Sequence, residues 1–352
     1  MGCVCKEYVT SAPQETVARQ LRRQRDACAM LGSPLYAGLL ERAAEDVEAG
    51  GPFWRVFEPF AEWPGGSAYE LRVMGALHRL VLAGDAPQLA AHFAPGGDAA
   101  AAWPVVRQLV EERGDEVRDI ALAHGVQTNE VGRCAALAPA ILWCSRGMPL
   151  RLLELGASAG LNLRWDAYRY EDLWGDPHAR VKLERRYEGT RPPFEPSSAE
   201  VVERSGCDAH PIDPASDEGR LTLLSFVWPD QEERISLLRA ALDAAPAIEA
   251  PVEQASAGEW LERSLAGPLP SGVATVVFHS IFWQYMDGEE RELVRGTLAA
   301  AGARATDDSP LAWVRMESKD ELTRVEATLW PGGETRLLGR AGYHGRPVLW
   351  LA

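Results

Sequence analysis

Hydrophobic residues recur at the spacing of an α-helix through the first part of the chain. In one segment Val17, Leu21 and Cys28 fall on a single helical face, and the same period continues to about residue 145. Residues 1–145 are therefore predicted to form a helical N-terminal domain that caps a bound substrate. The segments with the clearest helical period are 17–31, 35–47, 71–81, 106–120 and 128–145.

The last of these segments directly precedes the first predicted strand. Thr128 and Asn129 are residue types that cap helix N-termini, and Gly147 is typical of a helix end. In the sheet predicted below, this helix packs beside the cofactor site, so Asn129 is also expected to contact a cofactor.

After Gly147 the pattern changes to short apolar runs separated by amphipathic segments. Such an alternation of strands and helices predicts a mostly parallel sheet with helices on both faces. The predicted strands span 150–155, 199–207, 251–255, 273–278 and 311–316, and helices are expected to follow them from Gly160, Pro229, Gly258 and Glu289 and near Lys319.

The C-terminal residues predict an antiparallel end to this sheet. Two runs of strand-forming residues flank the Pro-Gly-Gly turn at 331–333, and a last strand is expected at 347–351. Five strand–helix steps closed by an antiparallel hairpin are the element order of a Rossmann-like class I methyltransferase sheet. We therefore predict an α/β fold of this type over residues 146–352, with its ligand at the carboxyl ends of the strands.

The stretch LLELGASAGLNL, residues 152–163, joins the first predicted strand to the segment that follows. A dinucleotide-binding fingerprint would place glycine at positions 156, 158 and 161, but the chain has Ser158 and Leu161 at the last two. The methyltransferase pattern, acid-x-G-x-G-x-G, fits better, with serine at its second glycine position. The matching residues are Glu154, Gly156, Ser158 and Gly160.

These residue types suit S-adenosylmethionine. Small residues allow the backbone to approach the methionine part of the ligand, and the unpaired N–H groups that follow face its carboxylate. Glu154 is placed to hold the ligand's ammonium group, and Asn162 is placed to add a polar contact.

The same stretch also satisfies G-x-S-x-G, the nucleophile turn of α/β-hydrolases. In that alternative Ser158 is the nucleophile, Asp307 or Asp308 is the acid and His344 is the base. The chain before residue 150 has a helical pattern, however, so the earlier strands of a hydrolase and their oxyanion loop are missing. A plain structural corner is the third interpretation.

Residues after the next two strands complete the predicted cofactor site. Asp208 is placed to bind the ribose hydroxyls, with Glu184 as its rival. Ser256 is placed to hydrogen-bond the adenine amine, less strongly than a charged acceptor would. The long spacing between Gly160 and Asp208 implies an insertion over about 165–195.

The segment FHSIFWQYM follows the fourth strand, where methyltransferases place substrate-facing residues. His279 and Tyr285 are the predicted catalytic residues, with His279 as a general base near neutral pH. Trp283 is predicted to form a wall for the substrate, and Glu317 to bind a cationic substrate or to pair with a neighbouring arginine. The alternative is a structural cluster in which His279 is a strand-end hydrogen-bonding residue and the aromatic side chains are core.

Composition narrows the class of protein. A formal net charge of −15 argues against nucleic acid as a partner, because neutralising phosphates requires clustered lysine and arginine. No apolar run reaches the length of a bilayer span and no secretion signal opens the chain, so a cytoplasmic protein without a membrane partner is expected. The six cysteines have no disulfide spacing, and no metal-binding motif appears, so no metal is predicted.

Six motifs occur in order along the chain: QTNEVGR, LLELGASAGLNL, ERSGCDAHPID, VWPDQEERISLLRAAL, VVFHSIFWQYM and LAWVRMES. With them the chain resembles, from about residue 15 to its C-terminus, a bacterial family catalogued as domain of unknown function 2332. That family is grouped with methyltransferase-like folds, so the resemblance implies such a fold here.

The sequence thus predicts a methyltransferase that uses S-adenosylmethionine as cofactor and a small molecule as acceptor. A non-catalytic relative that binds a cofactor or metabolite for regulation is the alternative, favoured by Ser158 and Ser256 at positions where the pattern has glycine and an acid. A hydrolase using Ser158 is the third hypothesis. The sequence leaves the acceptor and the oligomeric state open.

Overall fold

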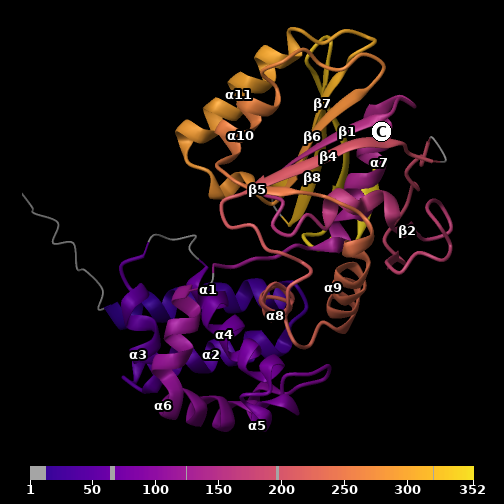
Figure 1. Ribbon diagram of the computed structural model, residues 1–352. Helices are drawn as coiled ribbons and strands as arrows, with labels where there is room; N and C mark the ends of the chain where they lie inside the picture. The colour runs from indigo at the N-terminus through magenta and orange to yellow at the C-terminus, as the bar shows by residue number, and fades with distance from the viewer. Residues whose placement is uncertain (1–12, 64–67, 124, 196–197, 320) are drawn as a thin grey trace, which may run out of the picture. The chain divides into compact units, whose positions relative to one another are not determined.

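The computed structural model describes residues 13–63, 68–123, 125–195, 198–319 and 321–352 (Figure 1). The chain divides into two compact units. The first contains the chain up to Thr128 together with Leu221–Ile235. The second contains Asn129–Arg220 and Ser236–Ala352.

The first unit is helical, as its periodicity predicts. Val17, Leu21 and Cys28 are fully buried, and aromatic rings fill the rest of the core. Phe53, for example, stacks on Trp103 with ring centroids 5.3 Å apart. The helices of the N-terminal segment are α1 (Pro13–Met30), α2 (Pro34–Glu48), α3 (Pro52–Phe57), α4 (Tyr69–Ala83), α5 (Pro87–Ala90) and α6 (Ala99–Ala123).

A segment from the second half of the chain completes this unit. Asp230 accepts hydrogen bonds from Ser33 Oγ at 2.7 Å and from Leu35 N at 3.0 Å, and so stabilises the N-terminus of α2. Trp228 is buried in the same core. The sequence predicts a helix here but not its membership of the N-terminal unit, because Asp230 and Ser33 are far apart along the chain. The helices on either side are α8 (Asp217–Ser225) and α9 (Glu232–Ala244).

The second unit begins at residue 129, so the predicted boundary at 145 is wrong. Helix α7 (Cys134–Ser145), which the sequence analysis assigned to the N-terminal domain, contacts strands of the sheet. Its residues are apolar on all sides, and such a helix is buried within a core rather than amphipathic on its surface. The predicted start at Thr128 or Asn129 is also wrong, because α7 follows the short 3₁₀ helix η2 (Val131–Arg133).

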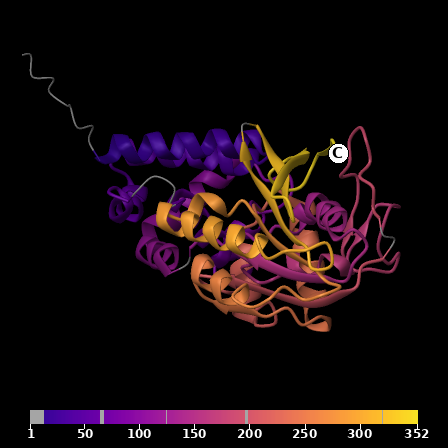
Figure 2. The same cartoon turned by 90° about the horizontal axis from the view of Figure 1, so that it is seen from above.

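The second unit is built on an eight-stranded sheet with the order β10-β9-β8-β7-β6-β1-β4-β5. Five neighbouring strands of this order, β7, β6, β1, β4 and β5, are parallel to one another. The last three strands of the chain, β8, β9 and β10, are antiparallel to their neighbours. This confirms the predicted mostly parallel α/β sheet, its five strands and its C-terminal hairpin (Figure 2, yellow). The strands are β1 (Leu150–Leu155), β4 (Val201–Asp208), β5 (Val252–Gln254), β6 (Ala274–Ser280), β7 (Leu311–Lys319), β8 (Leu322–Trp330), β9 (Glu334–Ala341) and β10 (Val348–Trp350).

Helices cover both faces of this sheet (Figure 1). On one face α10 (Ala257–Ser264) and α11 (Gly288–Gly302) share a core with Leu153 of β1 and Val277 of β6. On the other face lies α7, whose Trp143 is 6.0 Å from the guanidinium of a β9 arginine. The face that carries Leu153 and Val277 is called the α11 face below.

Two predicted helices do not form. The segment after Gly160 is a loop followed by the 3₁₀ helix η3 (Asn162–Ala167), because the side chain of Arg164 binds the carbonyl oxygens of Ala159 and Gly160. The predicted helix near Lys319 is also wrong. Residues on either side of it alternate between buried and exposed at a period of two, and β7 and β8 form a hairpin there.

The insertion predicted over about 165–195 forms a small aromatic subdomain. It contains the two short parallel strands β2 (Arg169–Tyr170) and β3 (Lys182–Leu183). Trp174 lies 5.5 Å from the ring centroid of Trp165 and stacks on Phe194 at 6.3 Å.

Candidate functional site

The direction in which the chain crosses the sheet reverses at β1. From β1 the chain moves outward through β4 to β5, and it then returns to the other side of β1 to place β6 and β7. In open parallel sheets, ligands bind in the crevice outside the carboxyl ends of the two strands at such a reversal. Here those strands are β1 and β6, which are followed by the loop 156–161 and the turn 281–286. The place expected for a ligand between these two segments is called the crevice below.

The loop after β1 has a backbone that favours glycine. Gly156 and Gly160 have φ values of +68° and +65°, and Ser158 also lies in the left-handed region at +54°. Neighbouring segments hold the loop: Ala157 N donates to Cys207 O at 2.9 Å, and Ile212 N donates to Ser158 O at 3.1 Å. The small residues are therefore required by backbone conformation and not only by space.

Glu154, at the end of β1, is a buried carboxylate with incomplete hydrogen bonding. Its side chain is 2% exposed, and its Oε2 has no hydrogen-bond partner among the described residues. Burial raises the pKa of Glu154 well above the usual value and the nearby Asp208 raises it further, while a hydrogen bond with Asn162 opposes both. An ammonium group beside Oε2 would supply the missing donor.

Buried polar side chains support the loop from behind. Asn129 Oδ1 accepts from Leu161 N at 3.0 Å, and Asn162 Oδ1 accepts from Cys134 Sγ at 3.2 Å. Asn129 is thus a support of the loop rather than a helix cap, and both asparagines are buried. The sequence analysis missed Arg164, which holds two loop carbonyls from within the segment expected to be helical.

Asp208 ends β4, the strand beside β1, as predicted. Its Oδ2 accepts from Ser158 N and its Oδ1 from His210 N, both at 2.9 Å. Each carboxylate oxygen can accept a second hydrogen bond, so Asp208 can both hold the loop and face a ligand. Its rival Glu184 is exposed after β3 in the aromatic subdomain and follows no strand of the main sheet.

Ser256 follows β5 at the same edge of the sheet and precedes the first residue of α10. It is exposed, and its side chain makes no capping hydrogen bond. The N-terminus of α10 is instead bound by Glu290, which accepts from Ala257 N at 2.8 Å.

The turn after β6 is strained. Ile281 has a φ of +49°, which costs a β-branched residue about 1–2 kcal/mol. Its N–H donates to Met316 O at 2.8 Å, and Arg133 Nη1 donates to Ser280 O at 3.1 Å. This turn places Phe282 against the loop after β1. A Cβ on Gly156 would overlap the Phe282 ring, which shows how closely the two segments pack. The sequence analysis gave no role to Phe282 or to this function of Arg133.

His279 and Glu317 form a pair on the α11 face. His279 is fully buried, and its Nδ1 lies 2.7 Å from Glu317 Oε1. The same oxygen accepts from Phe282 N at 2.9 Å and from Trp283 N at 3.2 Å. Burial raises the pKa of Glu317, but these three donors outweigh it and leave the pKa below its usual value. Glu317 therefore pairs with histidine and not, as one alternative had it, with an arginine.

The other residues of this turn are placed differently from one another. Trp283 is stacked on His279, with centroids 5.5 Å apart. Tyr285 is 61% exposed. The structure thus brings His279, Trp283 and Glu317 together and leaves Tyr285 outside that cluster.

The predicted hydrolase triad does not assemble. Ser158 follows the carboxyl end of β1. Asp308 instead precedes the amino end of β7, and its carboxylate accepts a hydrogen bond from Ser271, which precedes the amino end of β6. Because β1, β6 and β7 are parallel, these residues lie at opposite edges of the sheet. Asp307, next to Asp308, shares that edge.

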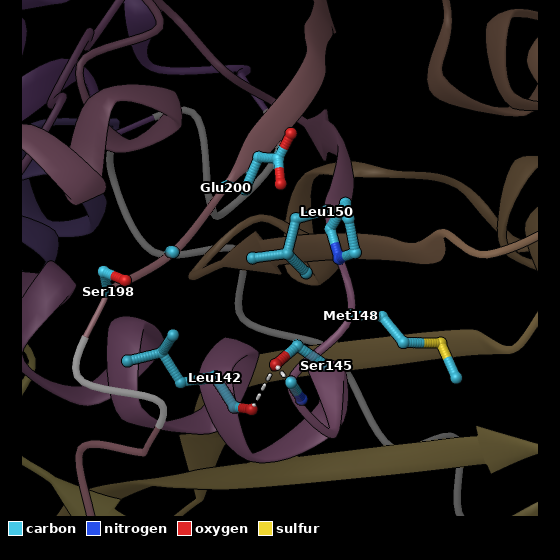
Figure 3. A pocket seen from close by; sticks show the side chains of 9 residues that line it. Leu142, Ser145, Met148, Leu150, Ser198 and Glu200 are labelled. Carbon is cyan, nitrogen blue, oxygen red and sulfur yellow. Dashed lines mark hydrogen bonds between the residues drawn. The ribbon is translucent and has the colours of Figure 1, made fainter.

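A cavity of about 220 Å³ lies at the amino end of β1, away from the crevice (Figure 3). Within it Ser145 Oγ donates to Leu142 O at 2.7 Å, and Glu200 borders the opposite side.

Among the described residues, no group of three or more acidic, histidine or cysteine side chains is arranged to hold a metal ion. Of the helices in the described part of the chain, none has the length and apolar character needed to cross a bilayer.

Comparisons with known proteins address the family. A family model described as "Uncharacterized protein conserved in bacteria (DUF2332)" matches residues 18–350. No curated protein matches the chain. One solved structure with detectable similarity is the crystal structure of Streptomyces venezuelae DesVI, at 10% identity and a TM-score of 0.23, covering 63% of this chain and 79% of that one. Since the family model spans nearly the whole sequence, the chain belongs to this bacterial family, as its six motifs led us to expect.

Proposed function

We propose that the crevice between β1 and β6 binds S-adenosylmethionine and that the protein transfers its methyl group to a small molecule. One observation carries the proposal: the buried Glu154, whose Oε2 has no partner in the described structure, is the next-to-last residue of β1, at the strand reversal where such sheets bind ligands. A carboxylate oxygen left without a donor is costly unless a ligand completes it.

The residues of the crevice match the parts of this cofactor. Glu154 would hold the ammonium group, and the loop from Gly156 to Gly160 would lie along the methionine part. Asp208 would accept from the ribose hydroxyls through its remaining lone pairs, and the exposed Ser256 would contact the adenine amine. Asn129 and Asn162 would act indirectly, by fixing the loop and the Glu154 carboxylate.

The bound cofactor would supply an electrophilic methyl group, and the protein's task would be to position the acceptor. Tyr285 is exposed beside the crevice turn and stays our candidate for acceptor contact. His279 is completely buried, so we assign it a positioning role, in which it fixes the strained turn through Glu317.

A second candidate function is ligand binding without catalysis. It is favoured by Phe282, whose ring occupies the space next to Gly156 that a ligand would approach, and by the two backbone amides already bound to Asp208. In that case the protein would report the presence of a cofactor or metabolite by a change at the 281–286 turn.

The test is calorimetric titration of the full chain with S-adenosylmethionine and S-adenosylhomocysteine. Glu154→Gln keeps the shape of the side chain but cannot become the carboxylate that a ligand ammonium would pair with, and we expect it to weaken binding about tenfold or more. Glu203→Gln is the matched control, because Glu203 is 51% exposed and pairs only with Arg151 in the described structure. Absence of binding by the folded wild type, or equal affinity of Glu154→Gln and wild type, would overturn the proposal.

Binding and catalysis are then separated by a second measurement. Release of S-adenosylhomocysteine in the presence of a panel of small-molecule acceptors would support methyl transfer. Tight binding of both ligands with no turnover on any acceptor class would support the non-catalytic candidate instead.

A further inference from the structure

A groove of about 480 Å³ lies on the α11 face, apart from the crevice. Its volume is within the range of small-molecule sites, which are mostly apolar with a few fixed polar groups. Helix α11 and strands β7, β8 and β9 each contribute residues. The lining residues that the argument uses are Arg295, Leu298, Trp313, Arg315, Glu326 and Trp330.

Aromatic rings form the walls of this groove, and guanidinium groups lie on them. The Arg315 guanidinium is 4.0 Å from the ring centroid of Trp313, and that of Arg295 is 4.9 Å from the centroid of Trp283. Trp283 is also stacked on His279 on the α11 face. The contacts hold both guanidinium groups at the groove and leave their edges for hydrogen bonding.

Arg315 is a cation with unused hydrogen-bonding capacity. Its side chain is 15% exposed, and its Nη1 donates to Thr328 Oγ1 at 3.0 Å. Its ion pair with Glu326 is long, at 3.6 Å, and Glu326 is shared with Arg324 at 3.1 Å. Because a guanidinium has five N–H groups, Arg315 keeps N–H groups that these two contacts do not use.

The carboxylates around the groove disfavour an anion with more than one negative charge. Glu326 lines the groove, and Glu317 lines it with one oxygen already bound to His279 and two amides. A dianion would approach both carboxylates, whereas one carboxylate can pair with a guanidinium edge in the bidentate manner.

Two ring nitrogens in the same cluster lack partners. His279 Nε2 and Trp313 Nε1 are buried and make no hydrogen bond within the described residues. Since buried polar groups are normally hydrogen-bonded, the aromatic layer at the groove is not completed by these parts of the chain alone.

We propose that this groove is a binding site for a planar aromatic monocarboxylate. The aromatic body would lie against Trp313, Trp330 and Leu298, and the carboxylate would bind Arg315 with Arg295 nearby. The sequence analysis predicted Trp283 and Glu317 as substrate contacts, and both line the groove. The proposal does not depend on the identity of the ligand in the crevice.

The test is calorimetric titration of the full chain with 2-naphthoate, and with the neutral 2-naphthamide as a ligand of the same shape. We expect 2-naphthoate to bind at least about tenfold more tightly than the amide, because charge-assisted hydrogen bonds are the stronger ones. The dianion naphthalene-2,6-dicarboxylate is expected to bind more weakly than 2-naphthoate.

Variants locate the site. Arg315→Met removes the charge with similar volume, and a loss of about tenfold in affinity for 2-naphthoate is expected. Arg295→Met, at a side chain that is 47% exposed, threatens the fold less and is expected to lose affinity severalfold. Arg336→Met is the matched control: Arg336 also lies over a tryptophan, Trp143, but outside the groove.

The outcomes decide the proposal. No binding of 2-naphthoate by the folded wild type, equal affinity for the acid and the amide, or unchanged affinity in Arg295→Met and Arg315→Met would each overturn it. These titrations are made without S-adenosylmethionine, so failure here is distinguishable from failure of the crevice proposal.

Discussion

Glu154 and Glu317 are both glutamates near the carboxyl ends of parallel strands in one sheet, yet their surroundings have opposite effects. Glu317 Oε1 accepts from a histidine ring and two backbone amides, and the pKa of Glu317 lies below its usual value. Glu154 is more deeply buried, has an oxygen without a partner in the described structure, and has a pKa raised well above its usual value.

The difference shows which carboxylate the protein completes by itself. Burial disfavours the charged form of both groups, and only sufficient hydrogen-bond donors reverse that effect. Glu317 has those donors, so its role in the described structure is to hold the 281–286 turn. Glu154 lacks them, so it is the carboxylate that a cationic ligand group can complete.

The largest effect is expected where the protein has already made its hydrogen bonds. Glu317→Ala should lower the free energy of unfolding by about 3 kcal/mol, because His279, Phe282 N and Trp283 N all lose their acceptor. Urea unfolding followed by circular dichroism measures this change.

Its control is Glu292→Ala on α11, whose carboxylate is 74% exposed and pairs with Arg295 on the surface. The control should change the free energy of unfolding by less than about 0.5 kcal/mol. A Glu317→Ala variant as stable as the control would mean that the pair is not a structural support.

The next effect concerns the contact that closes the crevice. Gly156→Ala should cost about 2 kcal/mol of stability, from a left-handed backbone and from overlap with the Phe282 ring. In Phe282→Ala the overlap is removed, so adding Gly156→Ala to that variant should cost only the backbone part.

The double-mutant cycle measures this coupling directly. We expect a coupling energy of about 1 kcal/mol between positions 156 and 282. Strict additivity of the two substitutions would show that Phe282 does not lie against Gly156 in solution.

Most of the sheet could be predicted from the sequence, and for a physical reason. Buried parallel strands are continuous apolar runs, and segments such as 150–155 and 273–278 are recognisable wherever they occur. The Pro-Gly-Gly turn at 331–333 likewise encodes its hairpin locally. Several predictions that failed depended on hydrogen bonds from side chains to the backbone, which the pattern of apolar residues does not record.

The failures show this dependence clearly. The segment after Gly160 has helical spacing, but a side chain four residues on binds its carbonyl oxygens and favours a tighter turn. Aspartate is a residue type common in turns, and only the structure shows that Asp230 binds the N-terminus of α2. Asn129 was predicted as a helix cap, and it binds the loop backbone instead. Its predicted contact with a cofactor stays a prediction.

The sequence predicts the positions of these candidate residues in the sheet but not their hydrogen bonding. Glu154, Gly156, Gly160 and Asp208 all lie at the predicted edge of the sheet. Hydrogen-bond satisfaction cannot be obtained from a motif, because the donors to Glu317 come from two other positions in the fold.

A smaller effect follows from the opposite pKa shifts of the two glutamates. Above the ordinary value of 4.5, folded Glu154 keeps a proton that the unfolded chain has lost, so wild-type stability falls as the pH rises through that window. Glu154→Gln should therefore gain stability relative to wild type as the pH rises above 4.5.

The contribution of Glu317 to stability changes with pH in the opposite direction. Its stabilisation is present above 4.5 and is lost as the pH falls below that value, so Glu317→Gln should differ most from wild type at neutral pH and least in acid. Urea melts of both variants between pH 3 and 8 measure the two slopes. Parallel pH profiles for Glu154→Gln and Glu317→Gln would contradict the contrast between the two carboxylates.

The smallest expected effect is the release of a fraction of a proton when the ligand binds. It connects the contrast between the two glutamates with the proposed function. If a ligand ammonium binds the Glu154 carboxylate, the proton held by the free protein must leave, so S-adenosylmethionine binding should release protons to the buffer. Titrations at one pH in phosphate and in Tris, whose ionisation enthalpies differ, measure that number. Glu154→Gln should release fewer protons than wild type, while Glu203→Gln, at an exposed residue of β4, should release as many. Equal release by all three proteins would mean that the ligand binds without meeting Glu154, because a carboxyl group that stays protonated contributes nothing to the difference between the buffers.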